Sequence, residues 1–189
     1  TFNGLAVSMA ALGTAAPSAV FGQSPAAVAR NKTLIVAVQA EAPVYRNVGQ
    51  ANPYSINNED FRGSIINMFE PLFYYNSNKN EVIPWVAASH ENNEDYSSFT
   101  VKLRDGVTWS DGKPFTADDV VYTLEMLMAN GKGKRDLTQS SGVADAVKAV
   151  SKIDPLTVKI DLTKGDPRFA FKYLINYFDI GLQWLPAHV

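Results

Sequence analysis

Alternation of apolar and polar residues predicts two half-buried β-strands, at residues 97–103 (SSFTVKL) and 155–162 (PLTVKIDL). Successive side chains of a strand point to opposite faces, so every second residue of these runs can face a core. Residues 32–40 (KTLIVAVQA) are almost continuously apolar and rich in β-branched residues, which is typical of a strand covered on both faces. The run LFYYN at 72–76 predicts one more short strand.

Apolar residues at helical spacing predict four helices. One lies in 59–72, where Pro71 ends it, and two more lie at 142–150 and at 166–178, the last starting with Pro167. The fourth follows Thr116 and has a buried stripe at Val120, Val121, Leu124, Leu127 and Met128. The predicted order is β, loop, α, β, β, α, α, β, α. It indicates a mixed α/β or α+β domain with antiparallel hairpins.

The stretch 104–127 (RDGVTWSDGKPFTADDVVYTLEML) is dense in acids, which raises the question of a catalytic or metal site. Its two Asp-Gly pairs, at 105–106 and 111–112, are strong turn signals, because glycine takes positive φ and aspartate bonds back to the chain. Thr116 followed by Asp119 predicts a capping box at the start of a helix, and Asp118 suits the positive end of that helix. We therefore expect these acids to be structural, with the Thr116 cap contributing more to stability than any of them.

No other pattern indicates an enzyme. HExxH, GxSxG and phosphate-loop motifs are absent from the sequence, and His90 and His188 are isolated. Asn76, Asn78 and Asn80 have the first three spacings of a calcium loop, but its later glycine and glutamate are missing. We expect no catalytic residues, no metal and no cofactor.

Composition and charge narrow the choice of partners only slightly. The chain has 189 residues, a net charge of −2 and no cysteine, which excludes disulfides and thiolate chemistry. One basic cluster (Lys132, Lys134 and Arg135) lies in a Gly-rich loop and is interpreted as a solvated turn, so no nucleic acid is expected as a partner.

Residues 1–29 carry no charged side chain, and their run LAVSMAALGTAA is similar to the apolar core of a secretory signal peptide. The run is too short for a convincing membrane-spanning helix. We interpret 1–29 as a signal peptide truncated at its start, and expect a periplasmic protein. The start TFNGLA would fit after a twin-arginine pair, which makes that export route one option. The alternative is a disordered Ala-rich tail.

From about residue 33 onward the order of the motifs resembles one known family. NMFEPLFYYN, then VIPWVAASHENNEDYSSFTVKLRDGVTWSDGKPFTADDVVYTLEML, then VKAVSKIDPLTVKIDL and WLPAHV are similar to the solute-binding proteins of ABC importers, extracytoplasmic family 5. This family includes dipeptide-, oligopeptide- and nickel-binding members. His90 stands where the family usually has tryptophan. The positions that follow the family pattern are Trp85, Ala87, Ser89, Phe99, Leu103, Arg104, Asp105, Gly106, Trp109, Asp111, Gly112, Phe115, Thr116, Ala117, Asp118, Asp119 and Val120.

The resemblance implies the N-terminal part of a two-lobed, type II-like periplasmic binding protein fold, incomplete because the second lobe is missing. Residues 30–60 would supply the first strand and loop of lobe I, 61–177 the extra domain of the peptide-binding group, and 178–189 the return towards lobe I. It further implies a monomer that closes on a small-molecule solute by hinge motion and delivers it to a membrane permease. The solute could be a peptide, opine, oligosaccharide or metal chelate.

The loop between the first strand and the helix in 59–72 is the predicted ligand contact, because open α/β sheets bind ligands beyond the carboxyl ends of their strands. Its side chains could supply an aromatic wall, an anion partner, an amide and a cation partner; they are Tyr45, Arg46, Tyr54, Asn57 and Glu59. Alternatively, both tyrosines pack the loop down and Arg46 is a surface charge. A different function also stays open at this point, that of a secreted enzyme or structural domain reusing the fold.

Overall fold

The computed structural model describes residues 53–54, 68–131, 137, 139–176 and 181–189, all of them within the unit Ala40–Val189. The interpreted signal peptide, the strand predicted at 32–40 and most of the helix predicted in 59–72 lie outside the described residues. The described ranges contain a sheet of four strands and a sheet of three strands.

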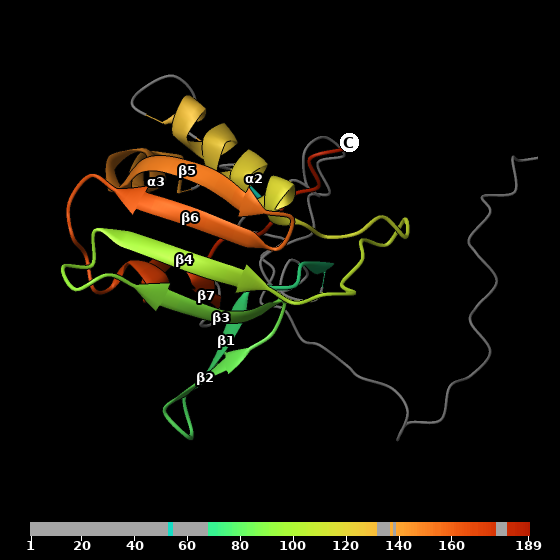
Figure 1. Ribbon diagram of the computed structural model, residues 1–189, viewed down its shortest axis with the longest axis horizontal. Coiled ribbons are helices and arrows are strands. Elements are labelled where there is room, and N and C mark those ends of the chain that lie inside the picture. The colour runs from blue at the N-terminus through green and yellow to red at the C-terminus, as the bar shows by residue number, and fades with distance from the viewer. Residues whose placement is uncertain (1–52, 55–67, 132–136, 138, 177–180) are drawn as a thin grey trace, which may run out of the picture. The chain divides into compact units, whose positions relative to one another are not determined.

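The four-stranded antiparallel sheet forms the centre of the described part (Figure 1). Its order is β3 (Ala87–Asn92), β4 (Ser98–Leu103), β6 (Thr157–Leu162) and β5 (Val147–Asp154). The strands predicted by alternation are β4 and β6, and both are confirmed. Every second residue of these two strands is buried, namely Phe99, Val101, Leu103, Val158, Ile160 and Leu162.

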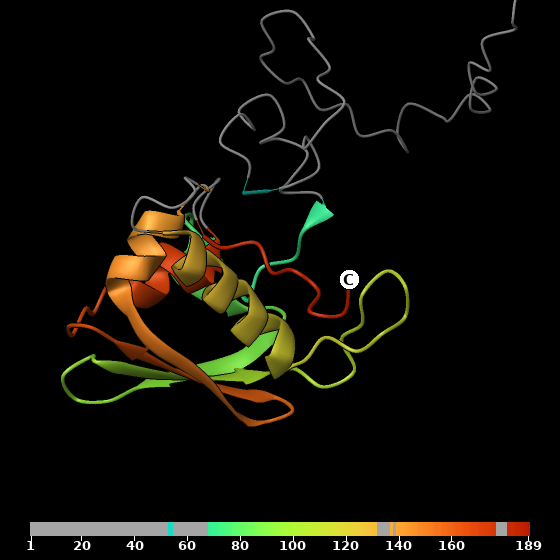
Figure 2. The same ribbon diagram turned by 90° about the horizontal axis from the view of Figure 1, so that it is seen from above.

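Helices α2 (Ala117–Asn130) and α3 (Ser140–Ala146) lie on one face of this sheet, as Figure 2 shows. Val120, Leu124 and Leu127 of α2 are completely buried, and Val121 and Met128 are partly buried against the same core. The predicted stripe is therefore the face that α2 packs onto the sheet, and burying its aliphatic side chains stabilises the fold by about 1.5–3 kcal/mol each.

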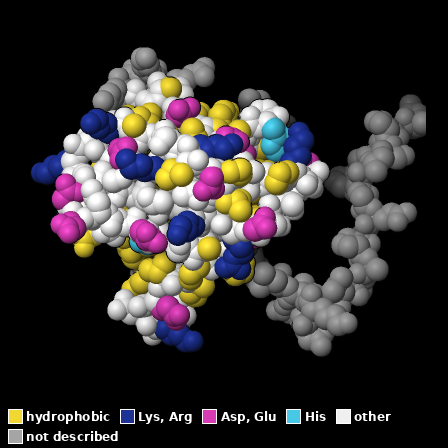
Figure 3. Space-filling view, in the orientation of Figure 1, with side chains coloured by type: hydrophobic (Ala, Val, Ile, Leu, Met, Phe, Trp, Pro, Cys, Tyr) yellow, Lys and Arg dark blue, Asp and Glu magenta, His cyan; other side chains and the backbone are white. Residues whose placement is uncertain are grey.

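The three-stranded sheet has the order β2 (Glu81–Pro84), β1 (Phe73–Asn76), β7 (Ile175–Asn176). Strand β1 pairs antiparallel with β2 and parallel with β7. Side chains on the hairpin of β1 and β2 form an aromatic cluster, in which Tyr74 and Trp85 meet edge to face at 5.4 Å and both donate hydrogen bonds to the Glu70 carboxylate. Figure 3 shows hydrophobic side chains gathered over this hairpin.

The helix predicted at 142–150 is wrong beyond Ala146, where β5 begins. Val147 and Val150 are three residues apart, which suits a helix and would place them on opposite faces of a regular strand. A β-bulge between Val147 and Ala149 shifts the register, so that Val147 pairs with Leu162 and Val150 with Ile160. Pairing with β6 thus overrides the helical spacing.

The helix predicted at 166–178 is also wrong in its extent. Its helical part is a five-residue π-helix, η3 (Ala170–Leu174), rather than a helix starting with Pro167. The chain then becomes β7, because Ile175 and Asn176 pair with β1. Strands β2 and β3, which have no clear alternation, were not predicted.

His90 on β3 lies in surroundings that disfavour its protonated form. Its ring lies edge to face on Phe73, with centroids 5.1 Å apart, and within the described part its buried Nδ1 atom has no hydrogen-bond partner. Burial lowers the pKa of the His90 imidazole, so below its ordinary value of about 6.5 the unfolded chain binds the proton first.

We therefore expect the free energy of unfolding to fall as the pH drops below about 6.5, and His90→Phe to reduce that fall. Urea denaturation of wild type and variant at about pH 7.5 and 5.5 measures the difference. An identical pH dependence in the two proteins would show that His90 is not held neutral by its surroundings.

Candidate functional site

The C-terminal segment comprises residues 181–189, and its first residues pack into the core. Trp184 has 1 % of its surface exposed, and it is among the largest buried side chains of the described part. The Leu182 N–H donates to the Tyr173 carbonyl oxygen at 2.8 Å, which ties the segment to η3. The segment is therefore part of the folded domain, not a loose tail.

Backbone N–H groups near the end of the segment donate hydrogen bonds to side chains of helix α2. The Leu185 N–H donates to Thr123 Oγ1 at 2.9 Å, and the Ala187 N–H donates to Asp119 Oδ1 at 2.8 Å. His188 Nε2 then lies 2.8 Å from Asp111 Oδ2. These contacts join residues far apart in the sequence to the stretch that carries the Asp-Gly turns.

Tyr54, the one predicted ligand residue that the structure describes, contacts the same segment. Its side chain is 1 % exposed, and its hydroxyl donates to the Gln183 carbonyl oxygen at 2.5 Å. Burial raises the pKa of Tyr54 strongly, so the hydroxyl keeps the proton that this bond requires. The ring packs into the core, as in the alternative interpretation of the tyrosines. The other predicted ligand residues lie outside the described residues: Tyr45, Arg46, Asn57 and Glu59.

Gln139 brings a third part of the chain to the same place. It has a left-handed backbone, with φ of 66°, and its Nε2 atom donates to the Gly181 carbonyl oxygen at 3.1 Å. The Tyr54 loop, the N-terminus of α3 and the C-terminal segment therefore meet at residues 181–183. We take this junction as the candidate functional site, because it holds Tyr54, the described side chain among the predicted ligand residues.

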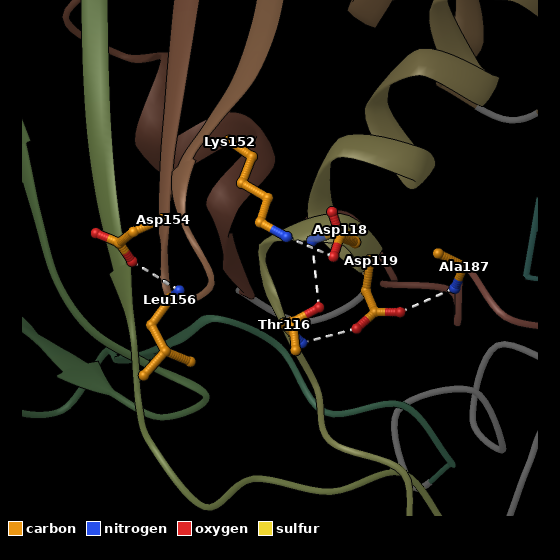
Figure 4. A network of polar contacts seen from close by, with 7 residues as sticks. All are labelled: Thr116, Asp118, Asp119, Lys152, Asp154, Leu156 and Ala187. Atoms are coloured by element: carbon orange, nitrogen blue, oxygen red, sulfur yellow. Dashed lines mark hydrogen bonds and ion pairs between the residues drawn. The ribbon is translucent and has the colours of Figure 1, made fainter.

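The acids of the helix start are structural, as Figure 4 shows. The capping box is present: Thr116 Oγ1 accepts the backbone N–H of Asp118, and Asp119 Oδ2 accepts the backbone N–H of Thr116 at 2.8 Å. Asp118 forms an ion pair with Lys152 at 2.8 Å. Asp119 is 3 % exposed, and its other oxygen accepts the Ala187 N–H. The scaffold role predicted for both acids is confirmed.

The two Asp-Gly turns are also as predicted. Gly106 and Gly112 have φ of 77° and 85°, the left-handed region that glycine enters without strain. Asp105 Oδ1 accepts the Gly106 N–H, and Asp111 Oδ1 accepts the N–H of Lys113 two residues on. The Lys113 N–H and then the His188 ring lower the pKa of Asp111, which keeps that carboxylate charged in neutral and mildly acidic solution.

The asparagine-rich turn after β1 uses its side chains internally. Asn76 Oδ1 accepts the N–H groups of Asn78 and Lys79, and Asn80 Oδ1 accepts the Tyr75 hydroxyl. These oxygens thus serve the turn, which argues against a calcium site.

Over the described ranges there is no group of three or more His, Cys, Asp or Glu placed to hold a metal ion. The same ranges contain no helix long and apolar enough to cross a membrane.

Comparison with known proteins identifies the family to which this chain is similar. Residues 81–183 match the model of the bacterial extracellular solute-binding proteins, family 5 Middle. The nickel-binding periplasmic protein of Escherichia coli is 35 % identical over 109 residues, covering 57 % of this chain and 20 % of that protein. The dipeptide-binding protein of Escherichia coli is 26 % identical over 166 residues, covering 78 % of this chain and 31 % of that protein.

A solved relative has the same fold. The oligopeptide-binding protein AppA of Bacillus subtilis, in complex with a nonapeptide, superposes with a TM-score of 0.56 and 26 % identity, over 71 % of this chain and 25 % of that one. The chain spans 20 % and 31 % of the two curated relatives. The matched region exceeds half of the chain and contains both Asp-Gly turns and the capped helix. The chain belongs to the bacterial extracellular solute-binding proteins of family 5.

Proposed function

We propose that this chain is a portion of the extracytoplasmic solute-binding component of an ABC import system, which captures a peptide or similar small solute and delivers it to the membrane permease. The observation that carries the proposal is the family match over residues 81–183. The relatives named for dipeptides and nickel support a small solute as ligand. The structural use of the acids in 104–127 supports binding rather than catalysis.

Within that protein we propose the same division as the sequence predicts, with 30–60 and 178–189 belonging to lobe I and 61–177 forming the extra domain. The bond from Tyr54 to Gln183 supports the first part of this division, because it joins a residue of 30–60 to a residue of 178–189. Export to the periplasm, by the twin-arginine route or another, belongs to the same proposal. Fractionation of cells expressing the complete reading frame tests it, and cytoplasmic retention would contradict it.

The ligand loop is proposed at residues 41–60, with Tyr54 as the anchor that positions it. In the protein expressed from the complete reading frame, we expect a bound solute to protect the backbone amides of 41–60 more than those of 104–127. Hydrogen exchange with and without solute measures this, after a screen of di- and tripeptides finds one that binds. Protection confined to residues beyond 189 would contradict the loop assignment while leaving the solute-binding function intact.

The 189-residue chain alone should bind no solute tighter than roughly millimolar. A small solute gains affinity from an enclosing pocket, and half of an enclosure leaves its polar groups solvated or unpaired. Calorimetry with di- and tripeptides on this chain, beside the protein from the complete reading frame, tests the expectation. A micromolar dissociation constant for the short chain would show that these 189 residues form a site by themselves.

A further inference from the structure

The two backbone N–H donors of the C-terminal segment are spaced to match two side-chain acceptors on helix α2. Asp119 and Thr123 are four residues apart, so they lie on the same face of α2, about 6 Å apart along its axis. Leu185 and Ala187, which donate to them, are two residues apart in the segment. Both backbone N–H groups reach their acceptors, at 2.9 and 2.8 Å.

The next residue, His188, brings an imidazole to Asp111, and the strength of this contact depends on whether the ring is protonated. Imidazoles titrate mostly between about pH 5 and 8. The side chains of His188 and Asp111 are 24 % and 46 % exposed, and their atoms Nε2 and Oδ2 lie 2.8 Å apart. With the carboxylate charged, a protonated ring forms an ion pair there, whereas a neutral ring forms only a weaker hydrogen bond.

Three other charged side chains lie near His188, and one of them, Lys113, also attracts the Asp111 carboxylate. His188 lines a hollow of about 350 Å³ together with Lys113, Asp118 and Asp119. Asp119 uses both oxygens on backbone N–H groups, and Asp118 is paired with Lys152. Asp111 is therefore the direct partner of the ring.

We propose that His188 and Asp111 form a pH-sensitive latch, which holds the C-terminal segment onto the turn at 110–113 when the ring is protonated. The inference goes beyond the proposed function and does not depend on the solute. Its consequence reaches the candidate site, because the same segment carries the Gln183 carbonyl that accepts the Tyr54 hydroxyl.

Hydrogen exchange of the protein expressed from the complete reading frame tests the latch. The protection of the Leu185 and Ala187 amides is measured at about pH 5.5 and 7.5, corrected for intrinsic exchange and expressed relative to the Leu124 amide in the core of α2. We expect this relative protection to be about two- to fivefold higher at the lower pH, the range that an exposed ion pair supports.

Two variants and a control decide the outcome. His188→Gln and Asp111→Asn should each abolish the pH dependence, while Asp118→Asn, which lines the same hollow but pairs with Lys152, should retain it. Equal protection at both pH values in the wild type, or an unchanged ratio in either latch variant, would overturn the proposal.

Discussion

Trp184→Ala should lower the free energy of unfolding by about 3–5 kcal/mol, the usual cost of removing a large aromatic side chain from a core. Trp184 is 1 % exposed and belongs to the same hydrophobic cluster as the residues of β4 and β6. The substitution therefore opens a cavity where the C-terminal segment joins the core. Urea denaturation followed by circular dichroism measures the change.

Trp184→Phe is the matched control. The indole Nε1 atom is buried and, within the described part, has no hydrogen-bond partner, so its removal breaks no bond. We expect this variant to cost about 1–2 kcal/mol, because most of the apolar volume remains. If Trp184→Ala cost no more than Trp184→Phe, the segment would not be packed in solution as the structure places it.

Asp119→Ala should cost about 3 kcal/mol. The substitution removes two hydrogen bonds from the backbone N–H groups of Thr116 and Ala187 to a charged carboxylate, and bonds of this kind contribute about 1.5–3 kcal/mol each. It also removes the attachment of the C-terminal segment to α2. The Ala187 amide should therefore lose its protection from hydrogen exchange in this variant, in addition to the drop in global stability.

Two neighbours serve as controls for Asp119. Thr116→Ala should cost about 1 kcal/mol by loss of the N-cap. Asp118→Asn should stay within about 0.5 kcal/mol, because its carboxylate is 59 % exposed and its ion pair with Lys152 is solvated. This order reverses the expectation that the Thr116 cap outweighs every acid of the stretch. If Asp119→Ala cost no more than Thr116→Ala, its bond to Ala187 would contribute nothing to stability.

The candidate site was predictable only in part. The predicted ligand loop stays a prediction; of its named residues the structure describes Tyr54, whose side chain is buried in the core. The partner of Tyr54, the Gln183 carbonyl, lies 129 residues further along the chain. Every residue has a backbone carbonyl, so no pattern of side chains could have selected this one. For the same reason Ala187 carried no signal of its bond to Asp119.

By itself, the sequence determined the features whose causes lie within a few residues. The Asp-Gly turns depend on the φ that glycine allows, and the capping box depends on two side chains three positions apart. Strands β4 and β6 alternate because each buries one face. These causes act locally, so they can be recognised from residue type and spacing.

The tertiary structure decided where local preferences were evenly balanced or where distant segments meet. Val147 and Val150 suit a helix or a bulged strand, and only pairing with β6 selects the strand. Residues 175–176 leave the helical pattern because β1 offers them backbone partners. The contacts of Asp119 with Ala187 and of Asp111 with His188 span 68 and 77 residues. They form because packing the core brings α2 and the C-terminal segment together, after which their polar groups must find partners.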